Sequence, residues 1–361
     1  MSAGCAGHAI YAAWPPVGAC FQNGKSVMKL GRLTVGMMAL LGAGVAQADW
    51  SPRVVSAQYI ATVSYGGASL SYSEDRRANG PLGSFAGKMA AAPYAFQSSL
   101  NDFMRQAAVS KGVNFVSGSL SGDPTVQIQP QGNGAVLLSL TGLSYDAYTQ
   151  FSGKRWGIFS YDCSNHASLA NIRVTGQYGA ADGRLLSDKV GVNADVGSST
   201  DCDSNISWIL PILGNILINT AEGKIDQGIV NGVTGALSQL KDGLFFGRDQ
   251  NYLTGLNQLI PADKVITLPN GQTFAIGQYV NNNLAYLIAN SQLTLKIGKG
   301  AVVKGVYGAG EPFNTQITGN VANLQLSVPG VTIGVSLIEQ VNVDWQWQCS
   351  LRDPSKRCPI P

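Results

Sequence analysis

Apolar and polar residues alternate with a period of two through much of the chain, which is the pattern of half-buried β-strands. The segment 53–73 predicts a hairpin that turns at Gly66-Gly67. The region 113–196 predicts successive strands at roughly 10-residue intervals, arranged as an antiparallel meander in a curved sheet or a sandwich. Strands resume after 291, and the cleanest alternation, over 338–349, predicts a half-buried strand.

Two segments change to a helical period. Apolar residues recur every three or four positions over 93–111, which predicts an amphipathic helix with Pro93 in its first turn. A longer stripe predicts one helix over 211–240, preceded by polar capping residues. Its apolar positions are Leu213, Leu217, Ala221, Ile225, Ile229, Val233, Ala236 and Leu240. Polar and charged residues on its other faces leave an apolar run too short for a transmembrane helix.

Shorter elements complete the pattern. Glycine, proline and alanine without a clear period predict a loop over 76–92. Two short helices are expected, one over 256–259 and one over 279–289. Between them, Pro269-Asn270-Gly271 predicts the turn of a hairpin.

Four glycines, Gly223, Gly228, Gly232 and Gly235, lie inside the predicted long helix. Each interior glycine costs a helix about 0.5–1 kcal/mol relative to alanine. Three interpretations of these glycines stay open: a sheet packed tightly over the helix, an acyl chain lying in a smooth groove, or a break in the helix.

The first 48 residues resemble an export leader. Basic residues after Met28 precede 13 apolar residues from Leu33 to Val45, and Ala46-Gln47-Ala48 forms a cleavage site. We expect 1–27 to be a mis-assigned upstream extension, with Met28 as the true start, and 28–48 to be a signal peptide. The mature chain, 49–361, is then a single β-rich domain, exported to the periplasm or outside the cell.

Charge narrows the class of partner. Charged residues make up only 12% of the chain, against about 25% in an average soluble domain. Three of the 24 Lys and Arg residues, and none of the 21 Asp and Glu residues, lie within 1–48. The remaining chain therefore has no formal net charge, and we expect no nucleic-acid partner.

Four of the six cysteines, Cys163, Cys202, Cys349 and Cys358, lie in the mature chain. An even number in an oxidising compartment predicts disulfides. Of the three connectivities that four cysteines allow, Cys163–Cys202 and Cys349–Cys358 close the shorter loops. No C-x-x-C pair is present, so we expect no zinc site.

The mature chain contains no recognisable catalytic motif, so we expect neither an enzyme nor a cofactor. His166 is the single histidine after the leader, and we interpret it as a structural or surface residue. Asp201-x-Asp203-x-Asn205 imitates the start of a calcium loop. The glycine and glutamate that such a loop needs later are absent, so helix capping is the simpler interpretation.

The order of a strand meander, a cysteine, one long helix and further strands resembles the tubular lipid-binding superfamily, which includes the bactericidal/permeability-increasing protein. The stretch that carries the resemblance is SNISWILPILGNILINTAEGKIDQGIVNGVTGALSQL, Ser204 to Leu240. The resemblance is one of architecture and implies an α+β fold: a highly curved antiparallel sheet wrapped around one long amphipathic helix, with a second, shorter helix. One departure is that Cys202 precedes the long helix, whereas in the bactericidal relatives a cysteine lies within it.

We therefore expect an exported protein that binds or carries a lipid or other apolar ligand between the long helix and the sheet. The expected lining residues are Leu213, Leu217, Ile225, Gly228, Ile229, Gly232 and Val233. A structural or adhesive cell-surface protein that contacts glycans or proteins is the alternative, and a secreted hydrolase is the third. The sequence predicts no oligomeric state.

Overall fold

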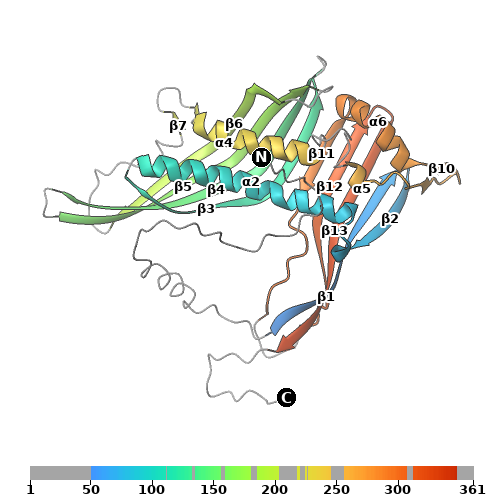
Figure 1. Cartoon of the computed structure of the whole chain (residues 1–361), viewed down its shortest axis with the longest axis horizontal. Coiled ribbons are helices and arrows are strands. Elements are labelled where there is room, and N and C mark those ends of the chain that lie inside the picture. Colours follow the sequence, from blue (N-terminus) through green and yellow to red (C-terminus); the bar gives the residue numbers. More distant parts are fainter. Residues whose placement is uncertain are drawn as a thin grey trace, which may run out of the picture. The chain divides into compact units, whose positions relative to one another are not determined.

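Nine strands form one antiparallel sheet in the order β2-β1-β13-β12-β11-β3-β4-β5-β6 in a computed structural model of the chain (Figure 1). The structure describes residues 50–110, 112–131, 135–155, 159–179, 185–202, 218–219, 224–225, 227–244, 256–306 and 312–347, all within the unit Ala48–Pro361. The sheet strands are β1 (Trp50–Tyr65), β2 (Ala68–Asp75), β3 (Asn114–Pro130), β4 (Ala135–Arg155), β5 (Phe159–Gly179), β6 (Leu185–Cys202), β11 (Gln292–Ile297), β12 (Gln316–Val328) and β13 (Val331–Trp347). The predicted signal peptide lies outside the described residues.

Most predicted strands are confirmed. β1 and β2 form the expected hairpin, in which Gly66 and Gly67 both have positive φ, as a tight two-residue turn requires. The meander appears as β3, β4, β5 and β6, each paired with the next. The expected spacing was wrong, because these strands are 17 to 21 residues long and each replaces one or two of the shorter strands predicted at roughly 10-residue intervals. In β13, Val341 and Val343 are buried as expected, whereas Trp347 near its end is 44% exposed.

The C-terminal strands join the N-terminal hairpin to the meander. β13 pairs with β1, and β11 pairs with β3, so β11, β12 and β13 lie between segments that are far apart in sequence. The period-two pattern predicts each of these strands but contains no information on which strand lies next to which.

Helix α2 (Pro81–Ser110) crosses one face of the sheet and contacts β1, β12, β3 and β4 (Figure 1). Its buried stripe recurs every three or four residues and packs into the hydrophobic core. The members of the stripe are Leu82, Phe85, Ala86, Met89, Ala92, Phe96, Leu100, Met104 and Ala108.

The predicted start of this helix was wrong. The helix begins at Pro81, in the segment expected to be a loop, and Pro93 lies in its interior rather than in its first turn. Pro81 is compatible with a first helical position because its missing N–H has no partner there in any helix. The cap comes from another element: the Glu74 carboxylate on β2 accepts hydrogen bonds from the N–H groups of Leu82 (3.0 Å) and Gly83 (2.9 Å).

Replacing Glu74 with alanine should lower the free energy of unfolding by about 1–2 kcal/mol. The substitution leaves two N–H groups without an acceptor and removes a negative charge from the positive end of the helix dipole. Urea denaturation of the purified protein measures the change. Glu74→Gln is the matched control, because its amide oxygen still accepts a hydrogen bond but carries no charge, so it should lose less. Equal stability of all three proteins would show that Glu74 does not cap α2.

The helix predicted over 211–240 is also corrected. Helix α4 (Gln227–Leu244) is 18 residues long and is preceded by two short paired strands, β7 (Ile218–Asn219) and β8 (Lys224–Ile225). Residues 203–217 lie outside the described part. Glycine and β-branched residues have low helix propensity, so the apolar periodicity before 227 did not decide the conformation.

The expected fold class is therefore wrong. The described chain is mostly β, and no long helix over 211–240 is wrapped by the sheet. Instead α4 packs beside α2, with Ile229, Val233 and Leu237 buried (Figure 1). Gly235 on α4 is exposed, and a Cβ there would meet no atom within 4 Å, so neither a close sheet nor a groove explains this glycine.

The remaining short elements confirm their predictions. Along the chain, helix α5 (Leu256–Leu259) comes before and helix α6 (Ile276–Asn290) comes after a small hairpin formed by β9 (Ile266–Thr267) and β10 (Thr273–Phe274). Among the helices that the structure describes, none is both long enough and apolar enough to cross a membrane.

Candidate functional site

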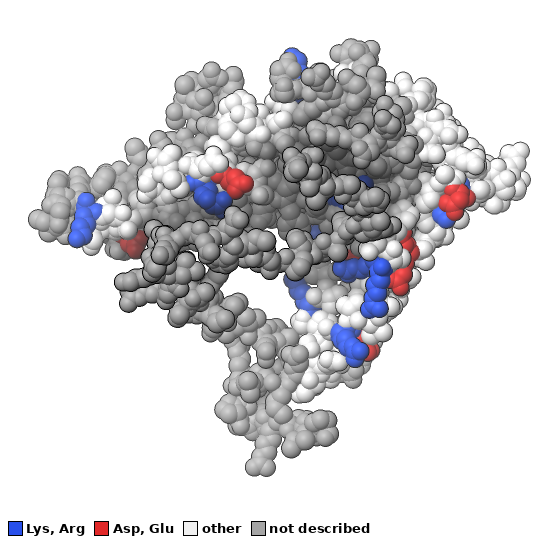
Figure 2. Space-filling view, in the orientation of Figure 1, with Lys and Arg blue, Asp and Glu red and all other residues white. Residues whose placement is uncertain are grey.

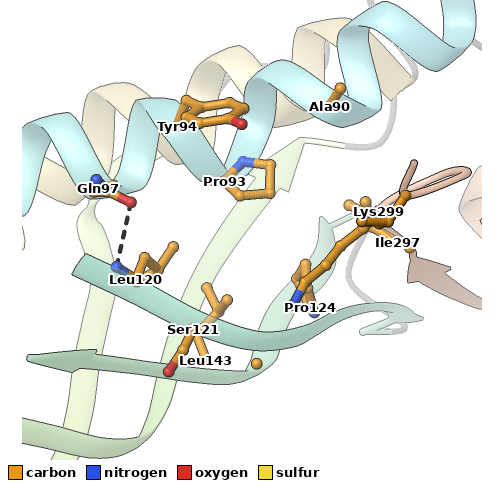
Figure 3. Close-up of a pocket in the computed structure, with 13 residues that line it drawn as sticks. Ala90, Pro93, Tyr94, Gln97, Leu120, Ser121, Pro124, Leu143, Ile297 and Lys299 are labelled. Carbon is orange, nitrogen blue, oxygen red and sulfur yellow. Dashed lines mark hydrogen bonds between the residues drawn. The ribbon is translucent and has the colours of Figure 1, made fainter. Parts of the chain in front are cut away.

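A cavity of about 360 Å³ lies between α2, the strands β3, β4 and β11, and the segment that follows β11 (Figure 3). This volume falls within the range of small-molecule sites. Most of its lining side chains are apolar. The lining residues are Ala90, Pro93, Tyr94, Gln97, Leu120, Ser121, Gly122, Pro124, Leu143, Ile297, Gly298, Lys299 and Val302.

The wall formed by α2 is a second stripe beside the core stripe. Ala90, Pro93, Tyr94 and Gln97 recur at intervals of three, one and three residues, so they share one side of the helix. Ala90 is exposed, and Tyr94 is 72% exposed at the rim. Pro93 has no N–H for the Met89 carbonyl, so this turn of α2 lacks one backbone hydrogen bond.

The floor is shaped by a β-bulge. The register between β3 and β4 shifts between Gly122 and Thr125, and both Gly122 (φ +100°) and Gly142 (φ +81°) have positive φ. A Cβ at either glycine would overlap a backbone carbonyl oxygen of the other strand, so the two strands meet there without room for a side chain. Pro124 is tolerated because a bulge does not need its N–H. Leu143, directly after Gly142, is buried at the floor.

The wall opposite α2 is a backbone segment held by hydrogen bonds. Gly298 N–H donates to the carbonyl of Val321 (2.9 Å), and Gly300 N–H donates to the carbonyl of Asn320 (2.9 Å). These two bonds fix the backbone on both sides of Lys299.

A buried carboxylate anchors the end of this segment. Glu339 on β13 is 8% exposed, and its Oε2 accepts a hydrogen bond from Ala301 N–H at 3.0 Å. Its Oε1 lies 2.8 Å from Nη1 of Arg76, which compensates the buried charge. Tyr59 pairs with Glu339 across the sheet. Burial raises the pKa of the Tyr59 hydroxyl, and the Glu339 charge raises it further, so this hydroxyl stays protonated at neutral pH.

Polar side chains tie α2 to the strands beside the cavity. Gln97 Oε1 accepts from Leu120 N–H (3.2 Å), which Figure 3 shows as a dashed line, and Gln97 Nε2 donates to the carbonyl of Gly118 (3.4 Å). One turn further along, the Tyr145 hydroxyl donates to Oδ1 of Asn101 (2.8 Å). Burial raises the pKa of Tyr145, so this donor keeps its proton. The distance between helix and floor is therefore set by hydrogen bonds as well as by packing.

The residues predicted to bind lipid lie elsewhere. Ile229 and Val233 are buried in the core on α4, and Gly228 and Gly232 lie on the same helix. Ile225 belongs to β8. Leu213 and Leu217 fall outside the described residues. The cavity residues are a different set, so the lipid-binding role of the predicted residues stays a prediction.

Two short stretches of the sequence, neither of them part of the predicted lipid-binding set, carry signals for the cavity. A Gly-Asp-Pro sequence at 122–124 within an alternating strand is typical of a bulge. Likewise, Gly298-Lys299-Gly300 places a cation between two small residues directly after a strand. Neither signal shows which other element faces it, because that depends on the pairing of β11 with β3.

The predicted Cys163–Cys202 disulfide is confirmed and joins directly paired residues of β5 and β6. Cys349 and Cys358 lie outside the described residues, so their pairing stays a prediction. His166 is exposed, with Nε2 3.3 Å from Oδ1 of Asp146, which agrees with a surface histidine. Within the described ranges, no three His, Cys, Asp or Glu side chains gather where a metal ion would bind.

On the face drawn in Figure 2, the charged side chains of the described residues form separate small groups of both signs. Of the 13 described residues that line the cavity, Lys299 is the one with a charged side chain.

Comparison with known proteins does not assign the chain to a family. No protein-family model and no curated protein matches it. One solved structure that is similar is described as the "Crystal structure of lipopolysaccharide binding protein", with 9% sequence identity and a TM-score of 0.19. The match covers 86% of this chain and 55% of that chain, so this chain spans about half the length of that protein. At this TM-score the likeness carries no argument about fold or ligand, and membership of the tubular lipid-binding superfamily stays a prediction.

Proposed function

We propose that this protein binds the acyl chain of a lipid or a similar apolar ligand in the cavity between α2 and the strands β3, β4 and β11. The observation that carries the proposal is a mostly apolar cavity of about 360 Å³ whose lining includes buried Leu143 and Ile297. An acyl chain would be held by the removal of its apolar surface from water. The protein acts as a binding or carrier protein, with no chemical step.

The walls of the cavity support this proposal because they are preorganised. Gln97 joins α2 to β3 by a hydrogen bond, and backbone hydrogen bonds join the segment around Lys299 to β12. Binding to such a site costs less free energy for ordering of the protein than binding to a flexible site does. The exposed Tyr94 and Val302 leave apolar surface at the rim, on the path of an incoming chain.

Export is part of the proposal. The predicted signal peptide would direct the chain to an oxidising compartment, and the Cys163–Cys202 disulfide is compatible with such a compartment. We infer that the mature protein acts in the periplasm or outside the cell, where a carrier would shield acyl chains from water.

A series of neutral alkanols tests the cavity without involving charge. Each added methylene should tighten binding about fourfold, which corresponds to ~0.8 kcal/mol per buried methylene. The gain should stop when the chain outgrows the cavity. Isothermal titration calorimetry of the protein with octanol, decanol and dodecanol gives the affinities.

Two neighbouring alanines on α2 provide a matched pair of variants. Ala90 and Ala91 are both exposed, but Ala90 alone of the two lines the cavity. Ala90→Trp should fill the cavity and weaken alkanol binding at least tenfold, while Ala91→Trp should leave it unchanged. Alkanol binding that is absent in the wild type, or equal in the two variants, would refute binding at this site.

A further inference from the structure

Lys299 gives the apolar cavity a single cationic group. Figure 3 shows its side chain extending from the segment after β11 across the cavity toward Pro124. Its neighbours in the lining, Ile297, Pro124 and Val302, are apolar. Among the described residues no carboxylate forms an ion pair with Lys299, whereas Arg76, Arg105 and Lys264 each have one.

The position of this ammonium group is set by the backbone on both sides of it. The N–H groups of Gly298 and Gly300 form hydrogen bonds with carbonyl groups of β12. A Cβ on Gly319 of β12 would overlap the carbonyl oxygen of Gly300, so the segment lies against that strand with no space for a side chain. Glu339 holds the next residue, Ala301. Because the backbone of this lysine is fixed beside an apolar cavity, its ammonium group attracts an anionic group to one defined place at the cavity.

We propose that the ligand of the cavity is an anionic amphiphile, whose acyl chain lies against Leu143 and Ile297 and whose carboxylate or phosphate pairs with the Lys299 ammonium group. This inference rests on the proposed acyl-chain site and adds the charge of the head group. A ligand with both parts contacts the apolar lining and forms an ion pair with Lys299, whereas a neutral lipid forms no ion pair there.

The test compares ligands that share one tail. Dodecanoate and dodecyl phosphate should bind the wild-type protein about fivefold more tightly than dodecanol, as expected for a partly exposed ion pair. Dodecylammonium should bind more weakly than dodecanol. The preference for anions should shrink as salt is raised, because salt screens an exposed pair. Whichever of the carboxylate and the phosphate binds more tightly identifies the preferred head group.

Two lysine variants distinguish an ion pair with Lys299 from a general attraction of anions to the positive charges of the protein. Lys299→Gln should abolish the preference for anions, so that dodecanoate, dodecyl phosphate and dodecanol bind this variant with equal affinity. Lys296→Gln removes an exposed charge on β11 that does not line the cavity, and it should keep the wild-type preference. Thermal melts of both variants check that each is folded.

The outcomes distinguish this inference from the acyl-chain site itself. Equal binding of anions and dodecanol to the wild type would overturn the role of Lys299 and leave the acyl-chain site standing. Binding of inorganic phosphate as tightly as dodecyl phosphate would also overturn it, because the tail would then contribute nothing. Failure of every tailed ligand to bind would instead remove the proposed function.

Discussion

The double variant Cys163→Ala, Cys202→Ala should lose about 4 kcal/mol of unfolding free energy relative to the wild type. The two cysteines are 39 residues apart, and closing a loop of that length removes conformational entropy from the unfolded chain. β6 is the last strand of the sheet and has β5 as its one neighbour there, so the disulfide joins an edge strand to the sheet. Urea denaturation under non-reducing conditions measures the difference.

Hydrogen exchange of backbone amides shows which part of the sheet is destabilised when the disulfide is absent. Without the disulfide, amides at the Cys202 end of β6 should exchange faster, while those of β13, in the other half of the sheet, should change least. A reductant should destabilise the wild type more than the double variant, in which this disulfide is already absent. Unchanged stability of the double variant would mean that the unfolded chain is not constrained by this bond.

Gly122→Ala should cost about 3 kcal/mol of stability and also weaken ligand binding. The residue has a φ of +100°, which penalises any side chain, and a Cβ there would overlap the carbonyl oxygen of Gly142. Both strands would have to separate at the cavity floor, which would displace Leu143 and Pro124. Denaturation gives the loss of stability, and calorimetry with dodecanol gives the loss of binding.

Gly112 is the matched control for this substitution. It also has a positive φ, +70°, but a Cβ there would meet no atom within 4 Å. Gly112→Ala should therefore cost about 1 kcal/mol, from backbone strain alone, and leave binding intact. Equal losses for the two variants would show that the close approach of β3 and β4 at the bulge contributes nothing to stability.

Local patterns predicted the elements that depend on neighbouring residues. The Gly66-Gly67 turn, the period of two in the meander and the alternation in β13 all follow from residues within one short segment. The Cys163–Cys202 pair also followed from a local argument, the preference for the connectivity that closes the shorter loops. These predictions held because side-chain period and turn conformation are set within a few residues.

Predictions failed where a distant residue decides the local conformation. The start of α2 at Pro81 depends on Glu74, whose carboxylate reaches the helix from β2 and replaces the polar residue that usually stands just before a helix. The long helix over 211–240 failed for a related reason. An apolar stripe is compatible with one helix and also with two short strands followed by a helix, so its period alone does not choose between them. In the structure α4 packs against α2, while β7 and β8 pair with each other.

The sequence by itself determined that this protein is β-rich and which segments alternate as strands, and it favoured the pairing of Cys163 with Cys202. Only the tertiary structure decided the site. The cavity exists because β11 pairs with β3, α2 crosses above them, and the bulge at Gly122 shapes the floor. Strand pairing depends on which edges meet when the core is buried, and that is a property of the whole chain that no local period encodes.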